Sequence, residues 1–247
     1  MREQAYERPL AAGQLRYERA GQPTGAVESW RWSAAATDAG QGTPGYRILR
    51  VDLDARAAPS GHSYLYNLVQ RENGRFEQLK YRFWANGMQL KGNVLLEDEE
   101  IIATREVNEV YVSEETAVLP GYRFWFPSSV GLGLVGSSGF GNERIGVGET
   151  ADSDSIQTIT LQAPAGEIVL TADPPWPLGL VQVEVERTWG RPEVVRVAGQ
   201  EVTARPLTLT WSHHQRTVWL DQSGLILKME RDDGLTAVAT RTIRYQG

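Results

Sequence analysis

The 247-residue sequence contains no cysteine and only three histidines. Without thiols the chain can form no disulfide, no thiolate metal site, no cysteine-ligated iron–sulfur cluster and no cysteine nucleophile. Its only imidazoles are those of His62, His213 and His214. Adjacent residues of a strand point to opposite faces, so His213 and His214 are poorly placed to bind one ion together. We therefore predict no metal and no other cofactor.

Long apolar runs are also missing. No run approaches the roughly 18 residues that a membrane-spanning helix requires. Residues 1–10 have neither the apolar core nor the small-residue cleavage site of a signal peptide. These absences predict a soluble, cytoplasmic protein without a transmembrane segment.

An excess of positive charge is absent as well. The chain has 25 Lys and Arg against 31 Asp and Glu, and no basic stripe of the kind that binds phosphates. We therefore expect no nucleic-acid partner. The densest charge run is acidic, Glu97-Asp98-Glu99-Glu100. We interpret it as a solvated turn rather than a catalytic carboxylate pair, because unpaired acids are rarely buried.

Alternation of apolar and polar residues dominates the sequence. Four runs show it clearly: Leu49, Val51 and Leu53; Leu79, Tyr81 and Phe83; Val181, Val183 and Val185; and Leu225, Leu227 and Met229. This period of two is typical of strands with one buried face, which belong to antiparallel sheets. Helical spacing is weak: a short helix is an open alternative only in the first twenty residues, where Pro9 and Gly13 oppose it.

Turn signals separate these runs. Asn-Gly and Asp-Gly pairs supply the positive φ angles of tight hairpins. Three such pairs are present: Asn73-Gly74, Asn86-Gly87 and Asp233-Gly234. Gly199 and Gly224 mark further turns. The sequence predicts an all-β protein. We expect an antiparallel meander sheet curled into an open barrel or sandwich around an apolar cavity.

We expect one domain over residues 1–247. Two similar halves, about 25–127 and 156–247, are an open alternative, since residues 103–107 and 239–243 are similar. A Gly/Ser-rich segment, 128–155, separates them, and we predict a loop over residues 131–148. Gly131, Gly133 and Gly136 spell GxGxxG, but no βαβ pattern surrounds them, so we do not interpret them as a dinucleotide site.

Part of the second half resembles a known group of folds. The segments Val197–Ala204, Thr217–Asp221 and Gly224–Glu230 are similar to the last strands of bacterial lipoprotein-carrier-like and glycolipid-binding open β-barrel proteins. That resemblance implies one long antiparallel sheet wrapped around a cavity that accepts acyl chains. The missing signal peptide departs from exported carriers.

Aromatic side chains are the most informative excess. Eight Trp and nine Tyr accompany only five Phe, and Trp30 and Trp32 fall on one strand face. Such rings fill β-sheet cores or line ligand pockets. From alternation, six residues are predicted to line a common cavity: Tyr81, Phe83, Leu95, Phe124, Trp211 and Leu227.

These observations favour non-catalytic binding of a hydrophobic or lipid-like small molecule. One alternative is an enzyme on a β scaffold, acting on a carbohydrate or terpenoid through carboxylates and His213, with Asp221 as a candidate partner. The other alternative is a protein-interaction module without a pocket. The oligomeric state and the ligand do not follow from the sequence.

Overall fold

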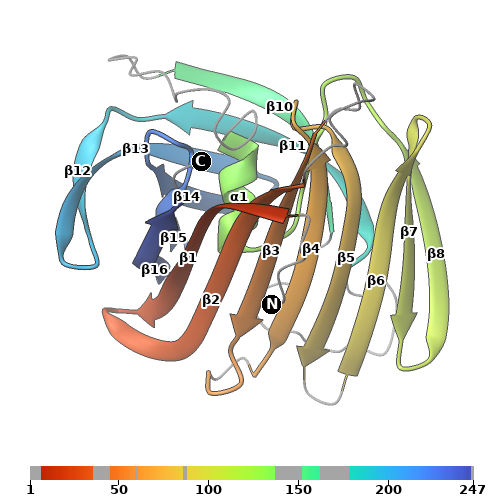
Figure 1. The fold of residues 1–247 in the computed structure, drawn as a ribbon, viewed down its shortest axis with the longest axis horizontal. Helices are drawn as coiled ribbons and strands as arrows, with labels where there is room; N and C mark the ends of the chain where they lie inside the picture. Colours follow the sequence, from red (N-terminus) through yellow and green to blue (C-terminus); the bar gives the residue numbers. More distant parts are fainter. Residues whose placement is uncertain are drawn as a thin grey trace.

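The computed structural model describes residues 7–35, 45–58, 61–85, 88–136, 152–161 and 178–245. Within these residues the chain forms sixteen strands and one short helix, which lies inside the curve of the sheet (Figure 1). The all-β, mostly antiparallel architecture predicted from the sequence is confirmed. The described part of the chain contains no helix long and apolar enough to cross a membrane.

The strands before the helix are longer on average than those after it. They are β1 (Glu7–Arg19), β2 (Gln22–Ala35), β3 (Tyr46–Asp54), β4 (Ser63–Arg71), β5 (Phe76–Ala85), β6 (Met88–Glu97), β7 (Glu100–Val107), β8 (Val110–Ala117) and β9 (Arg123–Trp125). Helix α1 (Ser129–Gly136) follows. The remaining strands are β10 (Asp152–Leu161), β11 (Leu180–Trp189), β12 (Glu193–Val197), β13 (Gln200–Trp211), β14 (His214–Leu220), β15 (Ile226–Arg231) and β16 (Leu235–Arg244).

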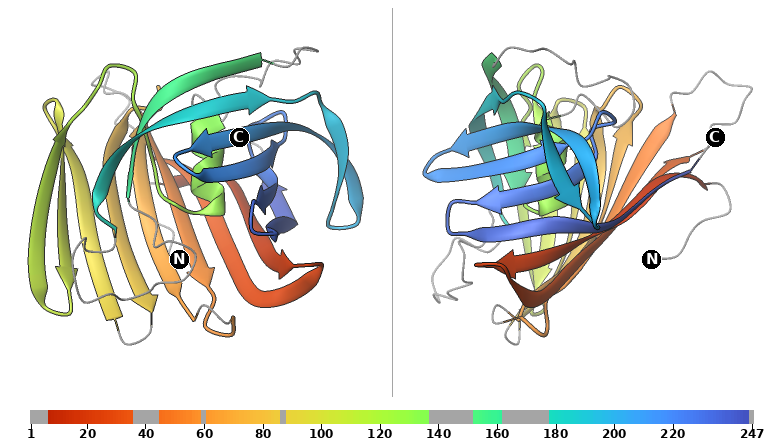
Figure 2. Two further views of the ribbon diagram at one scale, coloured as in Figure 1. Left: turned by 180° about the vertical axis from the view of Figure 1, so that it is seen from behind. Right: turned by 90° about the vertical axis from the view of Figure 1, so that its left-hand side faces the viewer.

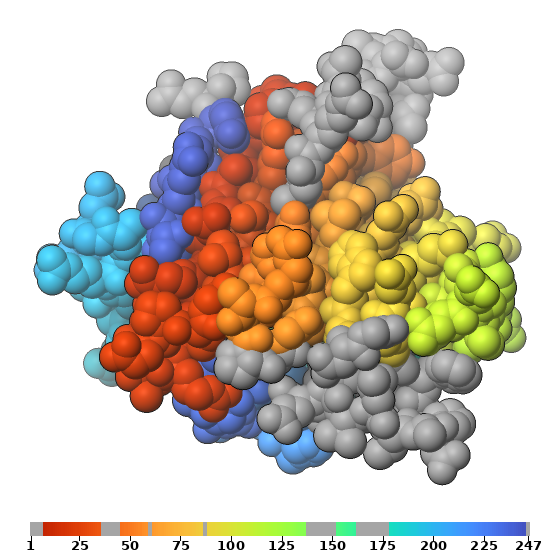
Figure 3. All heavy atoms as spheres, turned by 90° about the horizontal axis from the view of Figure 1, so that it is seen from below, coloured from red at the N-terminus to blue at the C-terminus, as the bar shows by residue number. Residues whose placement is uncertain are grey.

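Hydrogen bonds join the strands along one path. The order is β8-β7-β6-β5-β4-β3-β2-β1-β16-β15-β14-β13-β11-β10-β9, and β12 pairs with β13 off this path. β1 pairs with both β2 and β16, so the first and last strands meet in the middle of the sheet. In the space-filling view the blue C-terminal strands accordingly lie beside the red β1 and β2 (Figure 3). The end strands β8 and β9 do not pair, so hydrogen bonds do not close the sheet.

The sheet curves around α1. The helix lies between the long N-terminal strands and the shorter C-terminal ones in the views of Figure 2. Alternation identified the interior residues of β3, of β5 and of the segment 225–229, which includes the start of β15: Leu49, Val51, Leu53, Leu79, Tyr81, Phe83, Leu225, Leu227 and Met229 are all buried. Val185 is buried on β11, whereas Val181 and Val183 are half-buried.

The described turns follow the glycine signals. Gly74, Gly199, Gly224 and Gly234 have positive φ angles between 78° and 82°, a region that glycine adopts readily. They connect β4 to β5, β12 to β13, β14 to β15 and β15 to β16. The acidic run 97–100 is an exposed turn between β6 and β7, as predicted. The Asn86-Gly87 turn lies outside the described residues.

Two local expectations are wrong. The first twenty residues contain no described helix, because residues 7–19 form β1 in the middle of the sheet. Gly13 faces the interior opposite Trp30. Because glycine has no apolar side chain, the alternation that would have indicated a strand is interrupted there. The loop expected over residues 131–148 begins instead within α1, and residues 137–151 lie outside the described part.

Side chains join the edge strand β8 to β11. The buried Arg105 on β7 donates from Nη1 and Nη2 to Glu114 on β8, at 2.9 and 2.6 Å, and from Nη1 to the Leu178 carbonyl at 2.8 Å. Glu114 also accepts the Leu180 amide at 2.9 Å. Burial alone would raise the pKa of Glu114, but these hydrogen bonds and the Arg105 charge hold it below its usual value.

We predict that Glu114→Gln destabilises the fold, because it leaves the Arg105 guanidinium buried without a counter-charge. Removing one partner of a fully buried pair costs about 3–5 kcal/mol. Because the Glu114 side chain is 36% exposed, we expect a smaller loss of unfolding free energy, about 2–3 kcal/mol, measured by urea denaturation. The control is Glu115→Gln at the neighbouring exposed position. Equal effects of the two substitutions would contradict the structural role of this pair.

Candidate functional site

Helix α1 is apolar on every side. Residues 129–135 are all buried, among them Val130, Leu132, Leu134 and Val135. A helix without a polar face has to lie in a protein interior. Here α1 occupies the space inside the curve of the sheet.

Hydroxyl groups fix the start of α1. Ser128 Oγ accepts the Gly131 amide at 2.9 Å, as an N-cap residue does. The same oxygen lies 2.8 Å from the Tyr66 hydroxyl of β4, and Ser129 Oγ lies 2.6 Å from the Tyr17 hydroxyl of β1. The helix is thereby attached to two strands of the N-terminal part of the sheet.

A buried carboxyl group completes this attachment. Glu28 on β2 is fully buried, and it accepts hydrogen bonds from the Tyr17 hydroxyl and from the Val130 amide, the latter at 3.3 Å. Burial raises the pKa of Glu28, although these bonds and those from Ser128 and the Ser129 amide act in the opposite direction. Burial also raises the pKa of Tyr17, so its phenol remains a hydrogen-bond donor.

An arginine of another strand contacts the C-terminal end of α1. Arg187 on β11 donates from Nη1 to the Val135 carbonyl at 3.1 Å and from Nε to Asp154 on β10 at 2.8 Å. A cation at a helix C-terminus compensates the free carbonyl groups there. Both ends of α1 therefore depend on groups distant in the sequence.

Three glycines of α1 meet different surroundings. A β-carbon at Gly131 would overlap the Phe126 carbonyl oxygen, and one at Gly136 would overlap the Leu207 side chain. At Gly133 the nearest atoms, on Leu220 and Ile226, would be 3.7 and 3.8 Å away, which is ordinary contact. Close packing therefore requires glycine at two of the positions and leaves space at the third.

That space belongs to an apolar groove between α1, β2 and the β14–β15 turn. The residues lining this groove are Trp30, Trp32, Val130, Gly133, Leu134, Gly224, Leu225 and Ile226. It has room for about one water molecule. The groove is therefore filled almost completely in this state.

Trp30 stands out among the lining residues. Its side chain is 2% exposed, and its indole Nε1–H has no hydrogen-bond partner among the residues that the structure describes. The ring lies over Gly13 of β1, where a β-carbon would come within 2.6 Å of Cε2. Glycine on the neighbouring strand thus provides the space for this indole.

The six residues predicted to line a cavity are only partly brought together. Tyr81, Phe83, Phe124 and Leu227 are buried. Trp211 is half-buried near the end of β13, where it packs edge-on against Trp125 at a centroid distance of 5.5 Å. Leu95 is half-buried and points to the opposite face of β6 from the buried Val94. None of the six lines the groove beside α1.

Most interior aromatic rings pack against one another. Phe124 stacks on Phe76 at 4.0 Å, and Phe126 stacks on Tyr66 at 4.3 Å and contacts Tyr81 at 5.9 Å. These rings fill the interior on the side of α1 that faces β4 and β5.

The candidate catalytic pair is not assembled. His213 is exposed in the turn before β14, whereas Asp221 follows the other end of this strand. The Asp221 carboxylate accepts the Ser223 and Leu225 amides, at 2.8 and 2.9 Å, and pairs with Arg244. No group of metal-binding side chains occurs in the described ranges.

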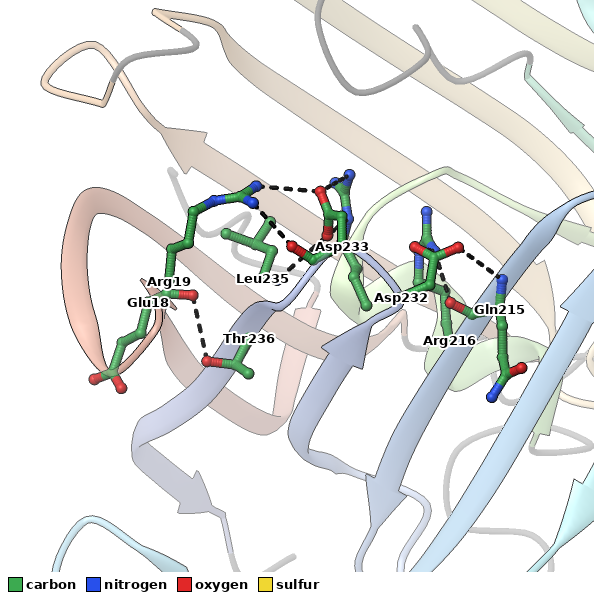
Figure 4. A network of polar contacts seen from close by, with 9 residues as sticks. Glu18, Arg19, Gln215, Arg216, Asp232, Asp233, Leu235 and Thr236 are labelled. Atoms are coloured by element: carbon green, nitrogen blue, oxygen red, sulfur yellow. Dashed lines mark hydrogen bonds and ion pairs between the residues drawn. The ribbon is translucent and has the colours of Figure 1, made fainter.

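Ion pairs instead connect the β15–β16 turn to two strands. Arg216 of β14 pairs with Asp232 at 2.6 Å, and Arg19 at the end of β1 pairs with Asp233 at 3.1 Å (Figure 4). Burial, together with His213 and Arg216, lowers the pKa of His214. The two pairs hold the β15–β16 turn against β1 and β14.

No protein-family model, curated protein or solved structure matches this chain. Its function is therefore inferred from its own residues.

Sequence reasoning missed the polar contacts of α1. Glu28 has the same parity as Trp30 and Trp32 on β2, so the alternation itself placed a carboxyl group on the buried face. Arg105 likewise lies on the same face of β7 as the buried Ile101 and Ala103. A charged residue at a position that alternation assigns to the buried face was therefore the sequence signal for these polar contacts.

We predict that Glu28 makes stability fall as the pH rises. Its carboxyl group ionises near pH 4.5 when unfolded but keeps its proton to higher pH when folded, so the unfolding free energy decreases as the pH rises from the unfolded pKa to the folded pKa. Glu28→Gln should remove this dependence. The test is urea denaturation of both proteins from pH 4.5 to 8. A constant difference in unfolding free energy across this range would contradict the assignment.

A second prediction compares glycines of α1. Gly133→Ala should raise the unfolding free energy by up to about 1 kcal/mol, because alanine favours the helix and the site has room. Gly131→Ala should lower it by about 1–3 kcal/mol, because the added methyl group overlaps backbone. Thermal denaturation of both variants measures the two effects. Similar shifts in the same direction would show that α1 is not packed as described.

Proposed function

We propose that this protein binds a hydrophobic, lipid-like small molecule in the interior of its curled sheet without catalysing a reaction on it. The observation that carries this proposal is the apolar groove lined by Trp30, Trp32 and α1, because one of its residues, Trp30, has a hydrogen-bond donor without a partner among the described residues. Ligand sites commonly combine an apolar lining with a few polar groups. The resemblance to lipoprotein-carrier-like proteins points to the same class of ligand.

A ligand larger than water enters this groove only if α1 moves. The helix has eight residues and contains three glycines, whereas isolated helices shorter than about 12–15 residues are marginal in water. Each glycine costs about 1 kcal/mol relative to alanine. α1 is therefore held mainly by its surroundings, and a ligand that replaces those contacts can displace it.

The contacts of α1 set a minimum ligand size. Its four aliphatic side chains, at about 1.5–3 kcal/mol each, contribute roughly 6–12 kcal/mol of apolar burial. An alkyl chain gains about 0.8 kcal/mol per buried methylene. A chain of about ten carbons or more is needed to compete with α1.

We expect binding to depend on chain length. Ligand-free protein is titrated with monoacylglycerols of eight, twelve and sixteen carbons, and tryptophan emission is recorded. The two longer chains should bind saturably, and the sixteen-carbon chain more tightly, whereas the eight-carbon chain should not bind measurably.

Gly133→Ala supplies the matched test of competition with α1. Because alanine stabilises α1 in the place that the ligand has to take, this substitution should weaken binding by up to about fivefold, about 1 kcal/mol, without loss of stability. Trp211→Phe, outside the groove, is the control and should leave affinity unchanged. Absence of saturable binding for every chain length, on protein shown by native mass spectrometry to carry no ligand, would overturn the proposed function.

A further inference from the structure

The unpartnered indole N–H of Trp30 limits what the ligand can be. Buried polar groups nearly always have a hydrogen-bond partner, yet the buried Trp30 Nε1 has none within the described part of the chain. Tryptophan can only donate, so the missing partner has to be an acceptor.

The position of the ring keeps this donor available. Trp30 is buried, and its Cε2 and Cζ2 atoms occupy the space above Gly13. A buried indole packed in this way cannot rotate freely toward another protein acceptor. Trp30 also lines the groove, so the unpartnered donor belongs to one of the groove's own residues.

The groove is unsuited to a negative charge. Among the described residues that line it, none is charged. Glu28 lies two residues from Trp30 on the same buried face of β2. A carboxylate or phosphate in the groove would lose its hydration without gaining a counter-charge, and an ionised Glu28 would repel it.

We propose that the ligand is a neutral lipid whose ester or amide carbonyl accepts a hydrogen bond from Trp30 Nε1–H. Free fatty acids and phosphate-bearing lipids are then poor ligands at neutral pH. This inference rests on the proposed function and deepens it, because it names the polar group that accompanies the apolar chain. A water molecule is the competing acceptor, since the groove has room for one.

The direct test observes the N–H itself. Protein labelled with ¹⁵N-tryptophan gives one indole signal for each of the eight tryptophans, and Trp30→Phe identifies that of Trp30. Addition of monomyristoylglycerol should move the Trp30 proton signal downfield, as a new hydrogen bond does. Addition of tetradecane, which has no acceptor, should not.

The second test compares affinities at pH 8 for monomyristoylglycerol, myristate and tetradecane. The wild-type protein should bind the ester at least tenfold more tightly than myristate. Trp30→Phe should reduce the ratio of ester to tetradecane affinity about five- to tenfold. Trp32→Phe, which removes the same ring area from the same groove, should leave that ratio unchanged.

The outcomes distinguish failure of the carbonyl inference from failure of the proposed function. If the three ligands bind but the Trp30 signal does not respond to the ester, or if myristate equals the ester, the carbonyl inference is overturned and the proposed function stands. If none of the ligands binds, both fall. If Trp30→Phe does not fold, the comparison of ligands on the wild-type protein still tests the preference for a neutral ester.

Discussion

The attachment of α1 to the N-terminal strands determines what the interior of this sheet contains. Glu28 and Tyr17 project from β2 and β1 toward the first turn of the helix, where Val130 and Ser129 complete the contacts. The helix brings four aliphatic side chains into the curve of the sheet. Without these polar contacts, the first amide groups of α1 would be buried without partners. The polar attachment therefore makes the apolar filling of the interior possible.

Cross-strand glycines impose a second constraint. Trp30 lies over Gly13 on β1, and Tyr81 lies over Gly92 on β6. Both aromatic residues are buried, and each has a polar atom without a partner in the described ranges, the indole nitrogen of Trp30 and the hydroxyl of Tyr81. The glycines accommodate large rings in a crowded interior and help to fix where those rings lie. Satisfying their polar atoms is a separate requirement, which packing alone does not meet.

The sequence predicted those features that depend on neighbouring residues. Alternation and turn glycines identified the antiparallel sheet because strand facing and tight turns have local signatures. α1 was missed because its glycines oppose a helix and because, apart from the Ser128 N-cap, its polar contacts come from distant residues such as Glu28, 102 positions from Val130. Leu95 was assigned to the cavity although Val94, Leu95 and Leu96 form a continuous apolar run, in which alternation does not select a face. The groove depends on the meeting of β2, α1 and the β14–β15 turn, and no local pattern contains that information.

The central claim is that a ligand competes with α1 for the interior of the sheet. Amide hydrogen exchange of residues 131–135, measured with and without saturating monopalmitoylglycerol, tests it most directly. The account predicts that the ligand accelerates exchange in α1 while the paired amides of β3 and β4 remain protected. Saturable binding with equal or slower exchange throughout α1 would contradict it.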